Sequence, residues 1–236
     1  MVDNLKIVSN NLLADYESEI TFNPLDTLTP KSKEELPFNY YQFYTSISSV
    51  YSSKIEGEEI EMDSFFKHKF LKVQYQPDYT KRSDDLFSAY EFVEENELTA
   101  ENVLASSQRG QIRTNPMFVL NEQDRIEYVA CEPYKVNQEW TLLFADIETL
   151  KASNLEVIEV FYYAAFIHLI FLKIHPLQDG NGRTARLLEK WFLRIKLGSI
   201  ATAIELEKNY YLHKSDYYTN IRQIGLEYDT LGMRNK

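Results

Sequence analysis

Residues 155–174 read LEVIEVFYYAAFIHLIFLKI, and this apolar stretch decides the fold. Two glutamates, one histidine and one lysine interrupt it, so its uncharged run is shorter than the roughly 20 residues that a membrane span needs. A helix that is apolar on nearly every side instead lies buried at the centre of a helical domain. Ser153 and Glu156 predict a capping box at its start, and Pro176 predicts its end. We therefore expect a buried core helix and no membrane partner.

The sequence on either side of this stretch is mostly helical in pattern. Apolar residues recur at spacings of three and four in further segments, at residues 39–56, 63–72, 83–94, 99–108, 138–150, 181–197 and 215–227. Gly57 and Gly198 follow two of these segments, where helices commonly end on glycine. Residues 23–37 contain three prolines and predict a surface connection.

Two short apolar segments break the helical pattern. Residues 116–120 and 126–130 are rich in strand-forming side chains and flank a polar turn, which predicts a β-hairpin. The expected fold class is therefore all-α, mainly helical, with one small β-hairpin.

Composition narrows the classes of partner and compartment. The chain has 236 residues, 44% of them hydrophobic, which suffices for a folded domain with a buried core. Its 25 basic and 36 acidic residues give a net charge of −11, which repels a phosphate backbone and argues against nucleic acid as a partner. The single cysteine, Cys131, can form neither an internal disulfide nor a multi-thiolate metal site. With no secretory leader in the sequence, we expect a cytoplasmic location.

A glycine-rich turn and two arginines follow the core helix, within the stretch HPLQDGNGRTAR at residues 175–186. Gly180, Asn181 and Gly182 can form a turn with positive φ, and a helix begins there. The backbone N–H groups of such a turn face an anion, and we call this arrangement an anion nest. Arg183 and Arg186 are three residues apart, so they share one face of the first helical turn and can clamp further anionic groups. Two cations at a helix N-terminus oppose the helix dipole, which indicates an external polyphosphate.

A candidate base and a candidate metal ligand lie in the same stretch. His175 ends the core helix and titrates near neutrality, as a general base does. Asp179 offers a hard oxygen ligand suited to Mg²⁺ that bridges phosphates. Each feature alone is common in a turn or on a solvated surface. A base, a metal ligand, an anion nest and two cations within twelve residues converge on phosphate chemistry.

A competing motif overlaps this loop. Gly180, Gly182 and Ala185 match G-x-G-x-x-A, the dinucleotide fingerprint. That fingerprint requires a preceding strand and a βαβ pattern, whereas a long helix and His-Pro come first here. We therefore reject a dinucleotide fold, and the glycine spacing and lysine of a P-loop are not found in the loop either.

The stretch from His175 to Arg186 resembles the signature of the Fic family, HPFx(D/E)GNGRxxR. The likeness covers roughly residues 95–200 and takes in His168, the Arg109–Arg113 stretch and the hairpin. Leu177 stands where the family normally has Phe, and we expect it to pack inward in the same way. The resemblance implies the helical Fic fold, in which the hairpin at 116–130 is a flap that aligns the target segment.

The same resemblance implies an activity. The chain would be a Mg²⁺-dependent protein adenylyltransferase that transfers AMP from ATP to a Tyr, Ser or Thr hydroxyl of a protein. His175 would remove the hydroxyl proton, and Asp179 would hold Mg²⁺ across the α- and β-phosphates. The Gly180–Gly182 turn would cradle phosphate, and Arg183 and Arg186 would fix the β and γ groups. Such transfers depend mainly on positioning and charge neutralisation.

A second segment, Ser52-x-x-x-Glu56-Gly57, precedes the core. Taken alone it predicts a solvated acidic patch, because three further glutamates follow within five residues. Beside a Fic core it resembles the family's inhibitory motif, (S/T)xxxE(G/N). Glu56 would then pair bidentately with Arg186 and leave ATP misaligned for attack, and Ser52 would cap or contact a phosphate.

We divide the chain into three parts on these grounds. Residues 1–94 form an N-terminal helical region with the inhibitory helix at about 39–57. Residues 95–200 form the catalytic core with the flap and the signature loop, and residues 201–236 form a C-terminal helical extension.

The residues that would bind adenine are left open. The resemblance would let one of Tyr210, Tyr211, Tyr217 and Tyr218 stack near adenine, and Asn209 is a further candidate. Aromatic residues at helical spacing, however, usually belong to a core. His168 we interpret as a buried histidine with a satisfied partner.

Two other functions stay open. The same scaffold could use another donor nucleotide or transfer phosphate itself, or the chain could be a nucleotide-sensing interaction module. The expected partners are ATP and an unidentified protein target that docks on the 116–130 hairpin. Removal of AMP from the target and formation of a homo-oligomer are both open.

Overall fold

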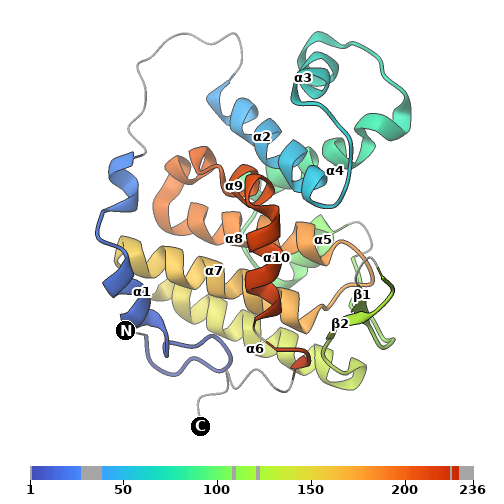
Figure 1. The fold of residues 1–236 in the computed structure, drawn as a ribbon. Helices are drawn as coiled ribbons and strands as arrows, with labels where there is room; N and C mark the ends of the chain where they lie inside the picture. Colours follow the sequence, from blue (N-terminus) through green and yellow to red (C-terminus); the bar gives the residue numbers. More distant parts are fainter. Residues whose placement is uncertain (1, 28–38, 108–109, 121–122, 224, 229–236) are drawn as a thin grey trace.

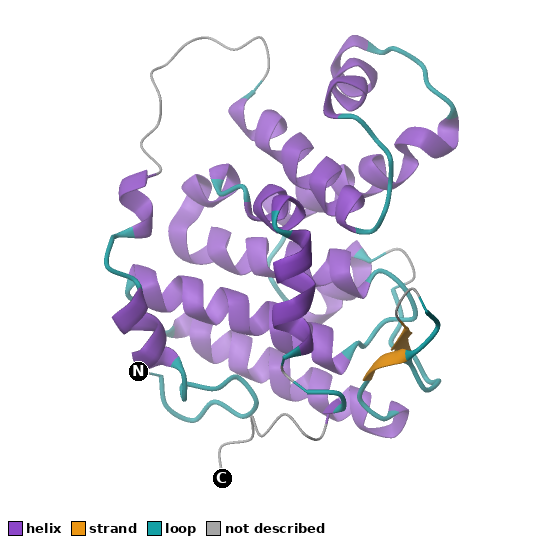
Figure 2. Ribbon diagram, viewed as in Figure 1, coloured by secondary structure: helices purple, strands orange, loops and turns teal. Residues whose placement is uncertain are grey.

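The computed structural model describes residues 2–27, 39–107, 110–120, 123–223 and 225–228. Helices make up most of the described chain, and two short strands form one antiparallel hairpin beside them (Figures 1 and 2). This confirms the expected fold class, mainly helical with a small hairpin.

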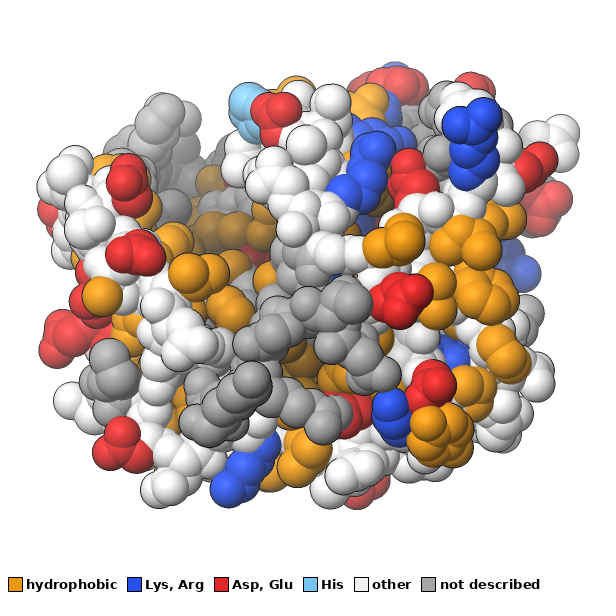
Figure 3. All heavy atoms as spheres, turned by 60° about the horizontal axis from the view of Figure 1, so that its bottom comes forward, with side chains coloured by type: hydrophobic (Ala, Val, Ile, Leu, Met, Phe, Trp, Pro, Cys, Tyr) orange, Lys and Arg blue, Asp and Glu red, His pale blue; other side chains and the backbone are white. Residues whose placement is uncertain are grey.

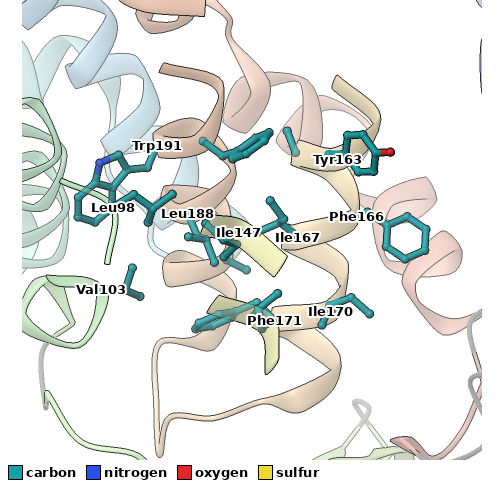
Figure 4. Packing of buried hydrophobic residues seen from close by; sticks show 14 of the residues in the cluster. Leu98, Val103, Ile147, Tyr163, Phe166, Ile167, Ile170, Phe171, Leu188 and Trp191 are labelled. Carbon is teal, nitrogen blue, oxygen red and sulfur yellow. The ribbon is translucent and has the colours of Figure 1, made fainter. Parts of the chain in front are cut away.

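Helix α7, Val157–Ile174, is the core helix, as the sequence predicts. It runs between α6, Pro133–Ala152, and α8, Asn181–Leu197, and α1, Leu13–Glu19, also packs on it. Figure 4 shows side chains from α6, α7 and α8, such as Ile147, Ile167 and Leu188, converging in one hydrophobic cluster. By length and composition α7 could cross a membrane, but 67% of it is buried inside the protein, as a core helix requires.

The start of α7 differs from the expectation. The capping box is made by Glu156 and Glu159, with the Glu156 N–H donating to Glu159 Oε2 at 2.9 Å. Ser153 instead closes α6, where its hydroxyl donates to the Thr149 carbonyl at 2.8 Å. The predicted box of Ser153 with Glu156 was therefore wrong, because α6 runs on to Ala152 and uses Ser153 as its own C-cap.

A second group of helices packs above the core. It consists of α2, Tyr40–Ile55, α3, Met62–Leu71, and α4, Pro77–Glu95, with a small apolar cluster of Val50, Ile60, Phe65 and Phe87. Helix α2 also packs on α9, Leu206–Leu212, and contacts α8 (Figure 1). Because α2 ends near the start of α8, residues far apart in sequence meet where α2 ends and α8 begins.

The hairpin joins β1, Phe118–Leu120, to β2, Ile126–Val129, close to the predicted segments. Phe118 pairs with Val129 and Val119 with Tyr128. Helix α10 spans Lys214–Arg222 and ends before the predicted residue 227. Beyond it the chain runs beside β2, where the Val129 N–H donates to the Leu226 carbonyl at 2.8 Å.

Several element limits were not evident in the sequence. Helices α4 and α6 each begin five or six residues before the predicted start, at Pro77 and Pro133, because proline is well suited to the first helical position. Helix α5 spans Ala100–Ser106, and short turns of 3₁₀ helix lie at Pro24–Thr27 and Gly198–Ala203. Of the predicted surface connection at 23–37, residues 28–37 lie outside the described residues. The three predicted domain limits remain a prediction.

Candidate active site

His175 caps the C-terminus of α7 in a left-handed conformation, with φ 52° and ψ 56°. Its Nδ1 lies 3.2 Å from the Leu172 carbonyl, which can only accept, so the neutral ring carries its proton on Nδ1 and leaves Nε2 as an acceptor. Burial lowers the pKa of His175 to about 4, and the nearby Arg113 charge adds to this. His175 is thus an uncharged imidazole at neutral pH with Nε2 available as an acceptor, and the expectation that it titrates near neutrality was wrong because the ring is buried.

Asn181 holds the loop after His175 in shape. Its amide accepts from the Leu177 N–H and donates to the Leu177 carbonyl, both at 2.8 Å. Leu177 is 2% exposed and joins the main hydrophobic cluster, so it packs inward as expected of the usual Phe. The Asn181 side chain is therefore occupied with the loop, and the group that it can offer to an anion is its backbone N–H.

Glycine is required at the two positions of the turn for different reasons. Gly180 has φ +80°, the left-handed region that glycine favours, and it is the N-cap of α8. Gly182 does not have positive φ, contrary to expectation. A Cβ on Gly182 would instead lie 2.6 Å from Glu56 Oε1 and 3.2 Å from Arg186 Nη1. Gly182 is needed because an acidic side chain approaches the helix N-terminus at this point.

Asp179 and Arg183 flank the turn on its open side. Asp179 Oδ1 accepts from the Gly180 N–H at 2.7 Å, and its side chain is 64% exposed. Arg183 Nη2 lies 3.5 Å from Asp179 Oδ2. The Arg183 Nε is buried and has no hydrogen-bond partner among the described residues. An unsatisfied buried donor beside an anion nest is suited to a bound anion.

Arg186 lies on the other side of the turn and is only 1% exposed. Its Nε donates to Ser52 Oγ at 2.9 Å, and its Nη2 donates to the Ser52 carbonyl at 3.1 Å and to Glu56 Oε1 at 2.7 Å. The Glu56 contact therefore uses one oxygen and one nitrogen instead of the expected bidentate pairing, because Nε is engaged by Ser52. Ser52 is fully buried, so the expectation that it contacts a phosphate is wrong in this conformation.

Gly57 follows Glu56 with φ +95° and ends α2, as the sequence predicts. The Glu56 carboxylate thereby reaches the N-terminus of α8, where the helix dipole and the free N–H groups favour negative charge. A carboxylate thus lies where the turn, Arg186 and the helix end would otherwise receive an anionic ligand.

Residues 86–193 match the sequence model of the Fic/DOC family. This range contains the hairpin, His175 and the whole turn up to Arg186. This segment of the chain is therefore similar to a Fic/DOC domain. No curated protein matches the sequence of the chain.

Solved structures share the fold of this domain. A Fic family protein from Desulfovibrio desulfuricans superposes with a TM-score of 0.67 at 19% identity over 91% of this chain, which spans 65% of that protein. A Fic domain containing signaling protein from Bacteroides thetaiotaomicron gives 0.66 at 18% identity, over 95% of this chain and 86% of that one. Fic-1 from C. elegans gives 0.54 at 16% identity, over 90% of this chain and 67% of that one. The described chain therefore has the Fic fold.

Behind the Fic/DOC loop lies a buried polar network. His168 Nδ1 contacts Glu189 Oε2 at 2.5 Å and its Nε2 contacts the Tyr217 hydroxyl at 3.0 Å, which agrees with a satisfied core histidine. Tyr217 also lies close enough to Arg186 to interact with its charge. Tyr210 donates to Glu189 Oε1 at 2.8 Å. The network therefore links the back of Arg186 to α7 and α10.

The other residues considered for adenine, Tyr218, Tyr211 and Asn209, differ in their neighbours. The Tyr218 hydroxyl is 3.4 Å from the Ile55 carbonyl, next to Glu56 at the end of α2. Tyr211 packs on Tyr51 with ring centroids 5.4 Å apart. Asn209 lines a hollow of about 460 Å³ between α7 and α10. Of these residues, Tyr218 is the one held beside the Glu56–Arg186 contact.

The hairpin presents apolar side chains to solvent. Phe118, Leu120 and Ile126 are 48%, 51% and 51% exposed, and Tyr134 just after the hairpin is 77% exposed. Figure 3 shows hydrophobic side chains gathered on its right-hand side, the side on which Figure 1 places the hairpin. This surface lies on the same side of the Fic/DOC domain as the loop.

Sequence reasoning missed two groups at this site. Arg113, 3% exposed, donates to the carbonyls of Ile174 and His175, although only its stretch was noted. Arg109 lies outside the described residues. Tyr217 was considered only for adenine, and its contact with Arg186 depends on the packing of α10, for which the sequence carries no local signal.

Proposed function

We propose that this chain transfers AMP from ATP to a Tyr, Ser or Thr hydroxyl of a protein target and that Glu56 restrains the reaction. The observation that carries the proposal is the state of His175: its Nδ1 is engaged by the Leu172 carbonyl, so Nε2 is a free base at the entrance to an anion-binding turn. A neutral base beside an anion nest and two arginines suits attack of a hydroxyl on a phosphate ester.

The reaction runs as an in-line substitution at the α-phosphorus. The target hydroxyl oxygen forms a bond to the α-phosphorus while the bond from that phosphorus to the bridging oxygen of the β-phosphate breaks. His175 Nε2 takes the hydroxyl proton, and pyrophosphate leaves with the bond electrons. The N–H groups at the start of α8 and the Arg183 and Arg186 guanidinium groups hold the phosphates in place.

Asp179 fits a role in holding Mg²⁺. It is an exposed carboxylate directly beside the anion nest, and Mg²⁺ is commonly held by one or two carboxylates together with substrate phosphates. When bound there, Mg²⁺ would neutralise charge on the α- and β-phosphates. Within the described residues, no group of three or more His, Cys, Asp or Glu side chains could hold a metal ion.

The restraint follows from competition for Arg186. The Glu56 carboxylate occupies Arg186 Nη2 and the N-terminus of α8, so the γ-phosphate of ATP must displace it or bind elsewhere. ATP that binds elsewhere presents its α-phosphorus out of line with the hydroxyl. We propose further that the target segment docks on the hairpin through Phe118, Leu120 and Ile126, since these side chains lie exposed at its surface.

Intact-mass analysis after incubation with ATP and Mg²⁺ tests the proposal. We expect Glu56→Gly to gain one or more AMP masses by self-modification, the wild type to gain far less, and the Glu56→Gly/His175→Ala double variant to gain none. A phosphate mass, or modification only with another nucleoside triphosphate, would favour the alternative donors. ATP binding without any added mass would favour a nucleotide-sensing module. Loss of AMP from a pre-modified sample would show the reverse reaction.

A further inference from the structure

The last turn of α7 is capped almost entirely by side chains. A helix leaves its final carbonyls without intrahelical partners, and these must be satisfied in another way. The Leu172 carbonyl receives His175 Nδ1, and the Lys173 carbonyl receives the Tyr128 hydroxyl at 2.7 Å. The carbonyls of Ile174 and His175 receive Arg113 Nη2 and Nε at 3.2 and 2.6 Å. Each carbonyl from 172 to 175 thus has a side-chain donor.

Arg113 supplies the largest share of these contacts. Besides the two carbonyls of α7, its guanidinium donates to the Asn115 carbonyl at 2.7 Å and to the Cys131 carbonyl. The Arg113 N–H also donates to the Pro176 carbonyl at 2.8 Å. One planar fork with five donors therefore joins the segment before the hairpin, the segment after it and the end of α7.

Tyr128 reaches the same turn from within the hairpin. It belongs to β2, is 8% exposed, and donates its hydroxyl to the Lys173 carbonyl. The Lys173 ammonium lies 3.9 Å from the centre of the Tyr128 ring and donates to the Gly225 carbonyl at 3.1 Å. The ring is therefore held by its hydroxyl and by the ammonium over its face.

We propose that Arg113 and Tyr128 are positioning residues. They hold the final turn of α7, and through it the ring of His175, in a fixed position relative to the hairpin. The proposal rests on the proposed role of His175 as the base. His175 is a non-glycine residue with φ 52°, a conformation that such residues rarely adopt without support from their surroundings. The three carbonyl contacts made by Arg113 and Tyr128 supply that support.

A functional consequence follows from where the two residues are anchored. Tyr128 belongs to the hairpin that the target is proposed to contact and Arg113 to the segment just before it, whereas His175 belongs to the core. A hydroxyl held on the hairpin and the nitrogen that takes its proton would then keep a constant separation. Displacement of a reacting group by about 1 Å can lower a rate by about 100-fold, so this separation matters for the chemical step more than for ATP binding.

Kinetics in the Glu56→Gly background separate positioning from general stability. Tyr128→Phe removes only the hydroxyl, and Arg113→Lys keeps the charge but loses the fork. We expect kcat of AMP transfer to fall by about 10- to 100-fold in each of these two variants, with KM for ATP changed by less than about twofold. Tyr134→Phe and Arg222→Lys are the matched controls, since Tyr134 bonds Glu132 and Arg222 pairs with Glu127 of the hairpin, away from α7. Equal kcat in Tyr128→Phe and Tyr134→Phe overturns the proposal.

Nitrogen-15 NMR of the imidazole rings gives a readout that does not depend on any transfer activity. The chain has four histidines, so His175 can be assigned from a His175→Gln spectrum. We expect a single Nδ1-protonated form in the wild type and in Tyr134→Phe, and mixed or exchange-broadened tautomers in Tyr128→Phe. If no variant transfers AMP but the tautomer changes as stated, the proposed function fails while the positioning role stands. An unchanged His175 spectrum in Tyr128→Phe overturns the positioning role, even if Arg113→Lys does not fold.

Discussion

Arg186 Nη2 lies 2.7 Å from Glu56 Oε1, although the two residues are 130 positions apart in the chain. The arginine is 1% exposed, whereas the glutamate side chain is 33% exposed. The buried cation therefore stays in place while the carboxylate is able to leave toward solvent. This asymmetry suits a contact that a second anion can replace.

Glu56→Gly is expected to lower the stability of the free protein while raising its response to ATP. Removing the carboxylate leaves a buried guanidinium with fewer partners, which costs about 2 kcal/mol. Phosphates can then take the vacated position, so saturating ATP and Mg²⁺ should raise the melting temperature of Glu56→Gly more than that of the wild type. Thermal melts with and without nucleotide check this. Glu59→Gly, at an exposed position in the same acidic segment, is the control, and an equal nucleotide shift in Glu56→Gly and wild type would contradict the competition.

Ser52→Ala should partly relieve the inhibition of AMP transfer by Glu56. Its hydroxyl accepts from Arg186 Nε, and a buried donor left without an acceptor costs about 1–3 kcal/mol. Arg186 then becomes less firmly held in the direction of Glu56, so we expect self-modification by AMP between the wild-type and Glu56→Gly levels.

Ser53→Ala is the matched control for this variant. Ser53 is equally buried but accepts from Ser83 Oγ at 3.1 Å, away from Arg186. Both variants should lose stability, but only Ser52→Ala should gain AMP by mass spectrometry. The same modification level in the two serine variants would show that Ser52 acts on stability alone.

The parts of the fold and the site that were predictable are those with a local signal. The core helix at 155–174 and the hairpin were evident from apolar patterning over adjacent residues. The signature loop was readable because its residues are contiguous, so that spacing alone groups His175 with the turn. The burial of Leu177 followed from its place between the core helix and the turn.

The parts that were not predictable depend on how distant helices pack. Ser52 was assigned to a phosphate because sequence spacing does not define which way α2 is rotated, and the structure turns this hydroxyl into the protein. Gly182 was assigned to positive φ, whereas the constraint on it is the approach of Glu56 from another helix. Arg113 and Tyr217 act through backbone and side-chain contacts that only the assembled core creates.

The acid limit of the transfer rate should lie well below the ordinary pKa of histidine. Burial lowers the pKa of His175 from 6.5 to about 4, so the ring stays neutral and basic as the pH falls through 6.5. We expect kcat of Glu56→Gly to stay level down to pH 6 or below, in contrast to the half-loss near pH 6.5 of an ordinary histidine base. A pH–rate profile measures this, and a half-point near 6.5 would contradict it.

The same shift predicts a change in stability with pH. Between pH 6.5 and about 4 the unfolded chain binds a proton at His175 that the folded chain does not bind. The contribution of His175 to the free energy of unfolding is therefore complete above pH 6.5 and is lost as the pH falls toward 4. Urea unfolding at pH 7 and pH 5 should show a smaller loss of stability for His175→Gln than for the wild type, and an equal loss in the two proteins would oppose the assignment.

Gly182→Ala tests separately whether this position matters for inhibition by Glu56 and for phosphate binding at the start of α8. Because φ of Gly182 is not positive, alanine fits the backbone, but its Cβ would lie 2.6 Å from Glu56 Oε1 and force that carboxylate away. The same methyl group faces the space where phosphate must approach the start of α8. We therefore expect Gly182→Ala to lose the Glu56 contact without gaining activity, and to reduce the activity of Glu56→Gly by about 10-fold or more when the two changes are combined. If Gly182→Ala alone reached the modification level of Glu56→Gly, the glycine would serve only to admit Glu56, and phosphate would not need this space.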